Sequence, residues 1–133
     1  MVIVILTHGI FGEELLRSAE MIIGRQDKVE VISINSGELM DDVYSKMENI
    51  LVKYQDESCL LYTDMFGGSP SNISMAYLAK DSVEVVSGVN LPMLLKAFTM
   101  RMDNNNSLSQ IAKESAEAGI ASIKVAGELL NKK

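Results

Sequence analysis

Four short apolar segments alternate along the chain with longer segments in which apolar residues recur every three or four positions. The short segments are apolar at consecutive positions and rich in β-branched residues, which is typical of parallel strands covered on both faces. The longer segments have the spacing of one buried stripe on an α-helix. We predict strands at residues 2–6, 29–34, 58–63 and 83–86.

Five of the longer segments have helical spacing. Ser36 stands in the Asn35-Ser36-Gly37 turn and is a plausible cap for the second of them. Because strands and helices alternate through short connections, the chain is predicted to have an α/β fold, a four-stranded parallel sheet with helices on both faces. We predict these helices at residues 11–24, 39–54, 70–78, 92–98 and 108–118.

The end of the chain is ambiguous. Ile120, Ile123 and Val125 could face a core from a helix or belong to a short strand at an edge of the sheet. Periodicity alone does not separate these two possibilities in a short apolar segment. We see no repeat and no second domain, and we treat residues 1–133 as a single domain.

Composition narrows the range of functions. The net charge of −6 and the lack of a basic cluster argue against nucleic acid as a partner. Cys59 is the only cysteine and lies within an apolar segment, so it packs as a small hydrophobic residue, which favours a cytoplasmic location. The first apolar segment is too short to be a signal peptide or to insert into a membrane.

Polar residues follow the ends of the predicted strands. The only histidine, His8, lies in the Thr7-His8-Gly9 turn between the first strand and the first helix. Asp64 ends the third strand, the turn Gly67-Gly68-Ser69 follows it, and Asn90 comes after the fourth strand. Because parallel strands end at one edge of a sheet, we expect these residues to converge there.

Together these residue types suit phosphoryl transfer through an imidazole. A carboxylate such as Asp64 fixes the tautomer of a neighbouring histidine and leaves the opposite ring nitrogen free to attack. Gly67 and Gly68 let backbone amides approach a phosphoryl group closely, and Ser69 adds a hydroxyl donor. We therefore predict that His8 accepts a phosphoryl group and passes it on, with no metal and no cofactor.

Two other classes of function fit parts of the pattern. A receiver-like signalling module would use Asp64 as the phosphoacceptor, but it needs acidic residues for magnesium after the first strand, where this chain has Thr7-His8. A non-catalytic, flavodoxin-like module would bind a nucleotide or flavin in the same crevice. The Gly67-Gly68 turn is too short for a dinucleotide fingerprint, and no Walker lysine follows it. One histidine and one cysteine are too few for a metal site.

Three segments of the sequence resemble those of a known protein family. In their order and spacing along the whole chain they are similar to the IIA domain of the mannose class of sugar phosphotransferase systems. The segments are Thr7-His8-Gly9, Thr63-Asp64-Met65-Phe66-Gly67-Gly68-Ser69-Pro70 with Asn72, and Ser87-Gly88-Val89-Asn90-Leu91-Pro92-Met93.

The resemblance implies specific roles and partners. His8 would be phosphorylated by the phosphocarrier HPr and would pass the phosphoryl group to a IIB component during sugar uptake. Asp64 would hold the proximal ring nitrogen of His8, and Ser69 with the amides of Gly67 and Gly68 would contact the phosphoryl oxygens. Members of the family form homodimers that exchange a C-terminal antiparallel strand, for which residues 120–125 are the candidate here.

Overall fold

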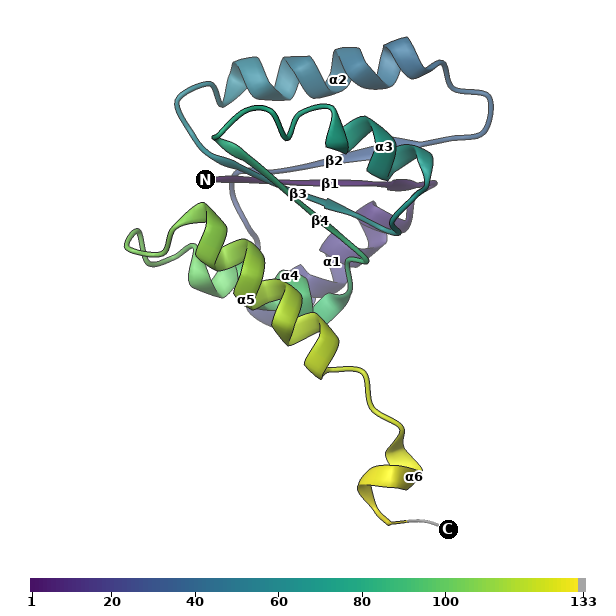
Figure 1. Cartoon of the computed structure of the whole chain (residues 1–133), viewed down its shortest axis with the longest axis vertical. Coiled ribbons are helices and arrows are strands. Elements are labelled where there is room, and N and C mark those ends of the chain that lie inside the picture. The colour runs from purple at the N-terminus through teal and green to yellow at the C-terminus, as the bar shows by residue number, and fades with distance from the viewer. Residues whose placement is uncertain (132–133) are drawn as a thin grey trace.

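The sheet has four parallel strands in the order β2-β1-β3-β4. It is seen in a computed structural model that describes residues 1–131 (Figure 1). The strands confirm the predicted α/β class and agree with the predicted positions to within two residues. They are β1 (Val2–His8), β2 (Val29–Ile34), β3 (Cys59–Thr63) and β4 (Val83–Ser87).

Helices cover both faces of the sheet, as predicted. In Figure 1, α2 and α3 lie on one side of the strands, and α1, α4 and α5 lie on the other. None of the helices within residues 1–131 is long and apolar enough to cross a membrane. The helices are α1 (Phe11–Ile23), α2 (Met40–Lys53), α3 (Ser69–Met75), α4 (Leu91–Met100), α5 (Leu108–Ala121) and α6 (Ala126–Leu129).

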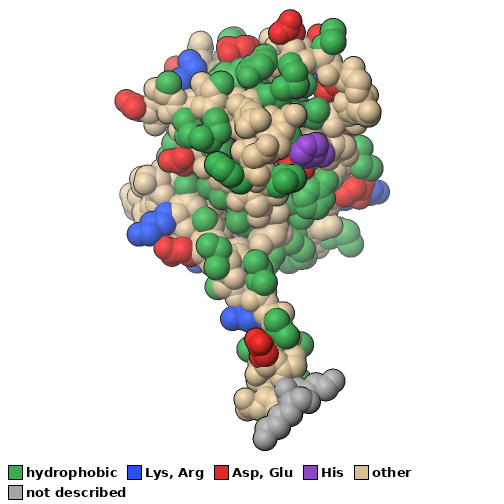
Figure 2. Space-filling model, turned by 45° about the vertical axis from the view of Figure 1, so that its right-hand side comes forward, with side chains coloured by type: hydrophobic (Ala, Val, Ile, Leu, Met, Phe, Trp, Pro, Cys, Tyr) green, Lys and Arg blue, Asp and Glu red, His purple; other side chains and the backbone are tan. Residues whose placement is uncertain are grey.

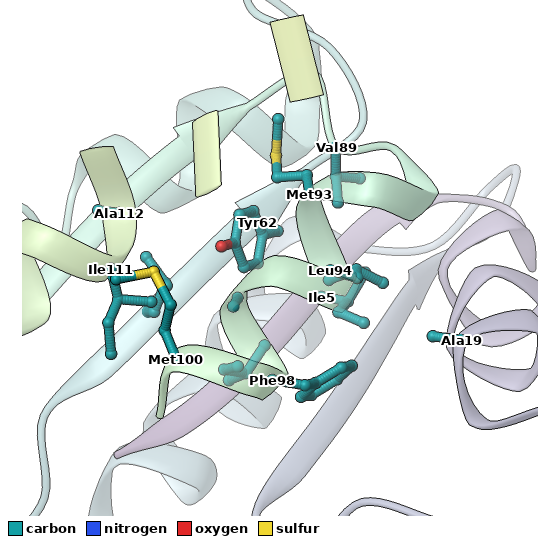
Figure 3. Close-up of a cluster of buried hydrophobic side chains, with 13 residues drawn as sticks. Ile5, Ala19, Tyr62, Val89, Met93, Leu94, Phe98, Met100, Ile111 and Ala112 are labelled. Carbon is teal, nitrogen blue, oxygen red and sulfur yellow. The ribbon is translucent and has the colours of Figure 1, made fainter. Parts of the chain in front are cut away.

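The core is divided between the two faces because side chains alternate along each strand. Ile3 and Ile5 of β1 point to the side of α1, α4 and α5, where they join the cluster drawn in Figure 3. Val2, Val4 and Leu6 belong to the cluster under α2 and α3. Because β1 is central and buried on both faces, it fixes the position of whatever follows its last residue.

Two polar contacts within the core hold helices against the sheet. The Tyr62 hydroxyl lies 2.6 Å from the Ser115 hydroxyl and ties α5 to β3. Thr7 is fully buried, and its hydroxyl oxygen accepts a hydrogen bond of 2.8 Å from the backbone N–H of Gly12. A Cβ atom at Gly12 would meet the Ile5 side chain at 3.0 Å and the Thr7 hydroxyl at 3.1 Å, so glycine lets α1 start close to β1 without displacing these side chains.

Two details differ from the sequence prediction. Ser36 does not cap the second helix: Leu39 precedes α2 and no side chain caps it, because the turn around Ser36 closes through a bond from Glu38 N–H to the Asn35 carbonyl. The helix predicted to reach residue 78 ends at Met75. The amides of residues 76–78 then bond three residues back, so this last stretch is a series of tighter turns.

The ambiguous C-terminal segment is helical at its start and end. Helix α5 continues to Ala121, and α6 begins at Ala126 after a short connection. Figure 1 shows this segment projecting from the body of the molecule. Residues 122–125 form no strand within the described chain, so the exchange of a C-terminal strand stays a prediction.

Candidate functional site

His8 and Asp64 meet at the carboxyl edge of the sheet. His8 is the last residue of β1 and pairs with Ile34 of β2, while Asp64 directly follows β3, the other neighbour of β1. The Nδ1 atom of His8 lies 2.7 Å from Oδ2 of Asp64. The backbone N–H of His8 donates to the same oxygen at 2.9 Å. The carboxylate therefore holds both the backbone and the ring of the histidine.

The second carboxylate oxygen of Asp64 is also occupied. It accepts a hydrogen bond of 2.9 Å from the backbone N–H of Met65. Partial burial raises the pKa of the Asp64 carboxyl, but the hydrogen bonds and charge of His8 and the Met65 N–H together outweigh it and lower the pKa. The side chain is 13% exposed, so Asp64 is a nearly buried carboxylate with three donors. This differs from the open acceptor that a receiver-like module would present.

This geometry determines which ring nitrogen of His8 is free. A carboxylate only accepts hydrogen bonds, so Nδ1 of His8 carries the proton and Nε2 keeps its lone pair. The His8 side chain is 51% exposed, and Figure 2 shows it at the surface. An oriented and accessible Nε2 has the properties of a nucleophile.

The diglycine turn lies directly against this ring. A Cβ atom built on Gly68 would come within 2.9 Å of His8 Cε1 and 3.5 Å of His8 Nε2. Gly67 has φ +90°, a left-handed conformation that glycine adopts without strain. Both glycines are therefore needed for the turn to bring its backbone beside Nε2.

The other predicted residues lie at the same edge in different roles. Ser69 is exposed and is the first residue of α3. Asn90 caps α4 by accepting from Met93 N–H at 3.1 Å, and its amide donates to the Gly119 carbonyl at 3.2 Å. Asn90 thus joins α4 to α5, and its side chain has a structural role. Within residues 1–131, no group of three or more histidine, cysteine or acidic side chains is arranged to hold a metal ion.

Exposed apolar side chains surround the histidine. They come from the segments that follow β1, β2 and β3, all of which end at this edge. Figure 2 shows hydrophobic side chains near His8 on this face. Large apolar side chains gathered on one face are typical of a surface that binds protein. The residues are Ile10, Phe11, Leu39, Met40, Met65 and Phe66, and we call them the apolar rim.

Sequence reasoning missed the backbone contributions. The N–H groups of His8 and Met65 hold Asp64, and a backbone donor has no signature in the sequence. The role of Thr7 was also missed, although its position before the first helix was a usable signal. Its hydroxyl accepts from the second residue of α1 and so anchors this helix beside His8.

Comparison with known proteins finds similarity to sugar phosphotransferase components. Residues 2–116 match the family EIIA-man, described as "PTS system fructose IIA component". The chain is 36% identical over 126 residues to the "PTS system mannose-specific EIIAB component" of Escherichia coli (strain K12), covering 92% of this chain. It spans only 39% of the length of that relative.

A second relative has a similar length to this chain. The "PTS system sorbose-specific EIIA component" of Lacticaseibacillus casei is 30% identical over 112 residues, which cover 84% of this chain and 80% of that protein. Among solved structures, EIIA of the phosphotransferase system from Streptococcus agalactiae superimposes with a TM-score of 0.87 at 27% identity. The match covers 96% of this chain and 98% of that chain. These likenesses confirm the fold and the resemblance drawn from the three motifs.

The lowered pKa of Asp64 gives a prediction for stability. The ionised carboxyl stabilises the folded state fully above its ordinary pKa of 3.8, and this contribution is lost as the pH falls through the lowered folded-state value. We expect Asp64→Asn to destabilise the protein near pH 6, with a difference from the parent that shrinks toward about pH 2. Urea unfolding across this pH range measures it.

The matched control is Asp81→Asn, which changes an exposed aspartate in a turn. It should shift the unfolding midpoint less than Asp64→Asn at every pH. A difference between parent and Asp64→Asn that stays constant with pH would show that the carboxylate does not stabilise the fold through its charge.

Proposed function

Because this chain belongs to the EIIA-man family of sugar phosphotransferase components, we propose that His8 is its phosphorylated residue. In this proposal His8 accepts a phosphoryl group from phosphorylated HPr in the cytoplasm and passes it to a IIB component, which supports sugar uptake. The observation that carries the proposal is the bond of 2.7 Å between His8 Nδ1 and Asp64, which leaves Nε2 free at the surface.

The transfer step follows from that tautomer. The lone pair of Nε2 attacks the phosphorus, a new P–N bond forms, and the P–N bond to the histidine of the donor breaks with its electron pair going to the donor nitrogen. The proton on Nδ1 stays between His8 and Asp64 throughout. Asp64 stabilises the positive charge that develops on the ring, and the second transfer reverses these steps toward the IIB component.

The diglycine turn would bind the phosphoryl oxygens. Gly68 lies against the edge of the ring that carries Nε2, so a phosphoryl group on Nε2 is formed beside the turn. We assign this binding to the amides of Gly67 and Gly68 and to the hydroxyl of Ser69. Transfer between two histidine nitrogens is nearly balanced chemistry, so positioning and donors around the equatorial oxygens provide most of the acceleration.

The apolar rim supports docking of protein partners at this edge. A carrier protein must place its own histidine in line with Nε2, which requires a contact surface around His8 and not a deep pocket. Phe11, Met65 and Phe66 are between 47% and 73% exposed. Phe11 lies three residues after His8 in the sequence, and Met65 and Phe66 directly follow Asp64. We propose that HPr and the IIB component use this rim.

Two features support a homodimer with an exchanged C-terminal segment. Strand β4 is at the edge of the sheet, so one of its sides can pair with another strand. Ile120, near the end of α5, and Ile123 and Val125, in the connection between α5 and α6, are between 62% and 75% exposed. A second copy of the chain would bury these apolar side chains.

The first test concerns His8. We expect His8→Gln to abolish labelling from phosphoenolpyruvate in the presence of the general first enzyme and HPr, because this is the only imidazole in the chain. The label on the parent protein should be acid-labile and base-stable, as a phosphoramidate is. Labelling that persists in His8→Gln would contradict the assignment.

The second test concerns Gly68. Its φ of −85° and ψ of 175° suit alanine, so Gly68→Ala should fold normally while its methyl group displaces the His8 ring. We expect the rate of phosphoryl acceptance to fall about a hundredfold, measured by rapid quench. An unchanged rate, with an unchanged urea midpoint, would show that the approach of the turn to the ring is not needed.

The third test concerns the dimer. We expect the parent chain to sediment as a dimer at micromolar concentration, and Ile123→Asp to shift it toward the monomer because a charge would enter an apolar contact. Gln55→Glu adds the same charge at an exposed position outside the C-terminal segment and should leave the dimer intact. A parent chain that sediments as a monomer would contradict the proposal.

A further inference from the structure

A polar hollow lies at the edge of the sheet opposite His8. Its lining includes Met1 and Lys28, the residues that directly precede β1 and β2, so the full length of β1 separates it from His8. Its volume is about 470 Å³, which is within the range of small-molecule sites. Arg101, Met102 and Asn104, which follow α4, also line it.

The hollow concentrates positive charge on an acidic protein. Arg25, Lys28 and Arg101 line it, in a chain whose net charge is −6. Arg25 is exposed and forms no ion pair within residues 1–131. Asp27 also lines the hollow, and Lys28 pairs with Glu57 at 2.9 Å, so the cations are only partly neutralised.

Arg101 is held in place by the backbone. Its guanidinium donates to the carbonyls of Met1 at 3.3 Å, Lys28 at 2.7 Å and Asp27. These three bonds leave two of the five N–H donors of an arginine without a partner among them. Burial lowers the pKa of the Arg101 guanidinium, an effect that the charges of Asp27 and Glu57 oppose. Arg101 is thus a fixed, partly buried cation that forms no salt bridge with a carboxylate among residues 1–131.

The loop that carries Arg25 and Lys28 is also fixed. Lys28 has φ +50°, a left-handed conformation that costs energy for a residue other than glycine. The surrounding structure imposes it, because the Lys28 carbonyl accepts from both Ile3 N–H and Arg101. The Gln26 backbone N–H donates to Glu20 at 2.8 Å and closes the loop. The backbone of the hollow is therefore arranged before any ligand arrives.

We propose that this hollow binds a phosphorylated small molecule that also carries hydroxyl groups. Arg25 and Lys28, with the spare donors of Arg101, suit a phosphoryl group. The side-chain amides of Gln26 and Asn104 line the same hollow and suit neutral hydroxyl groups. Such a ligand would bind independently of the phosphorylation of His8, because the two sites lie at opposite edges of the sheet.

Isothermal titration of the full chain with glucose 6-phosphate tests this inference. We expect saturable binding at millimolar concentration, competition by inorganic phosphate, and none with glucose. Arg25→Gln should weaken binding roughly tenfold, the loss expected for one charge-assisted hydrogen bond. The control Lys46→Gln removes the same charge from an exposed lysine of α2 outside the hollow and should bind as the parent does.

Binding should also be unchanged in His8→Gln, which separates this site from the one around His8 and keeps the inference independent of the proposed transfer activity. Three results would overturn it: no saturable binding, equal affinity in Arg25→Gln and the parent, or loss of binding in His8→Gln. Amide shifts upon titration should fall at residues 25–28 and 101–104.

Discussion

The Asp64 carboxylate is the contact on which the site depends. One of its oxygens receives both the backbone N–H and the ring Nδ1 of His8, and the other receives Met65 N–H. Through this group the ends of β1 and β3 are joined, and the tautomer of the only imidazole is fixed at the same time. The parallel register places the two residues within reach, because β1 and β3 are neighbours whose last paired residues are Leu6 and Thr63, and His8 and Asp64 lie just beyond them. The ionised Asp64 side chain therefore both holds two strand ends together and orients the ring of His8.

The strand positions and the convergence at the carboxyl edge could be predicted because both depend on patterns that a sequence shows directly. Consecutive apolar residues at 2–6 define a central strand, and parallel strands must end at one edge. The pairing of His8 with Asp64 followed from that edge together with the family motifs. The start of the second helix was predicted to within one residue, but its cap was not, because the turn around Ser36 closes on itself through backbone hydrogen bonds and Leu39 precedes α2.

The roles of some residues at the site depend on distances in the folded protein, which a sequence pattern does not show. Gly68 was predicted for the freedom of its backbone, yet its closer constraint is the space that the His8 ring occupies. Asn90 was predicted at the functional edge and is there, but its side chain is used to cap α4 and to hold α5. The C-terminal segment stayed ambiguous for a related reason: Ile120, Ile123 and Val125 are mostly exposed among the described residues, so packing within that part of the chain does little to define their conformation.

In the proposed function, the geometry of His8 also limits how the phosphoryl group would be relayed. With its N–H and Nδ1 tied to one carboxylate oxygen, the ring has no freedom to swing between two sites as a flexible arm would. The proposed donor and acceptor would then approach the same nitrogen from the same direction, and the binding of one would exclude the other. The donor and the acceptor would bind in turn, and the rate of the relay would be limited by how quickly one protein dissociates and the other binds.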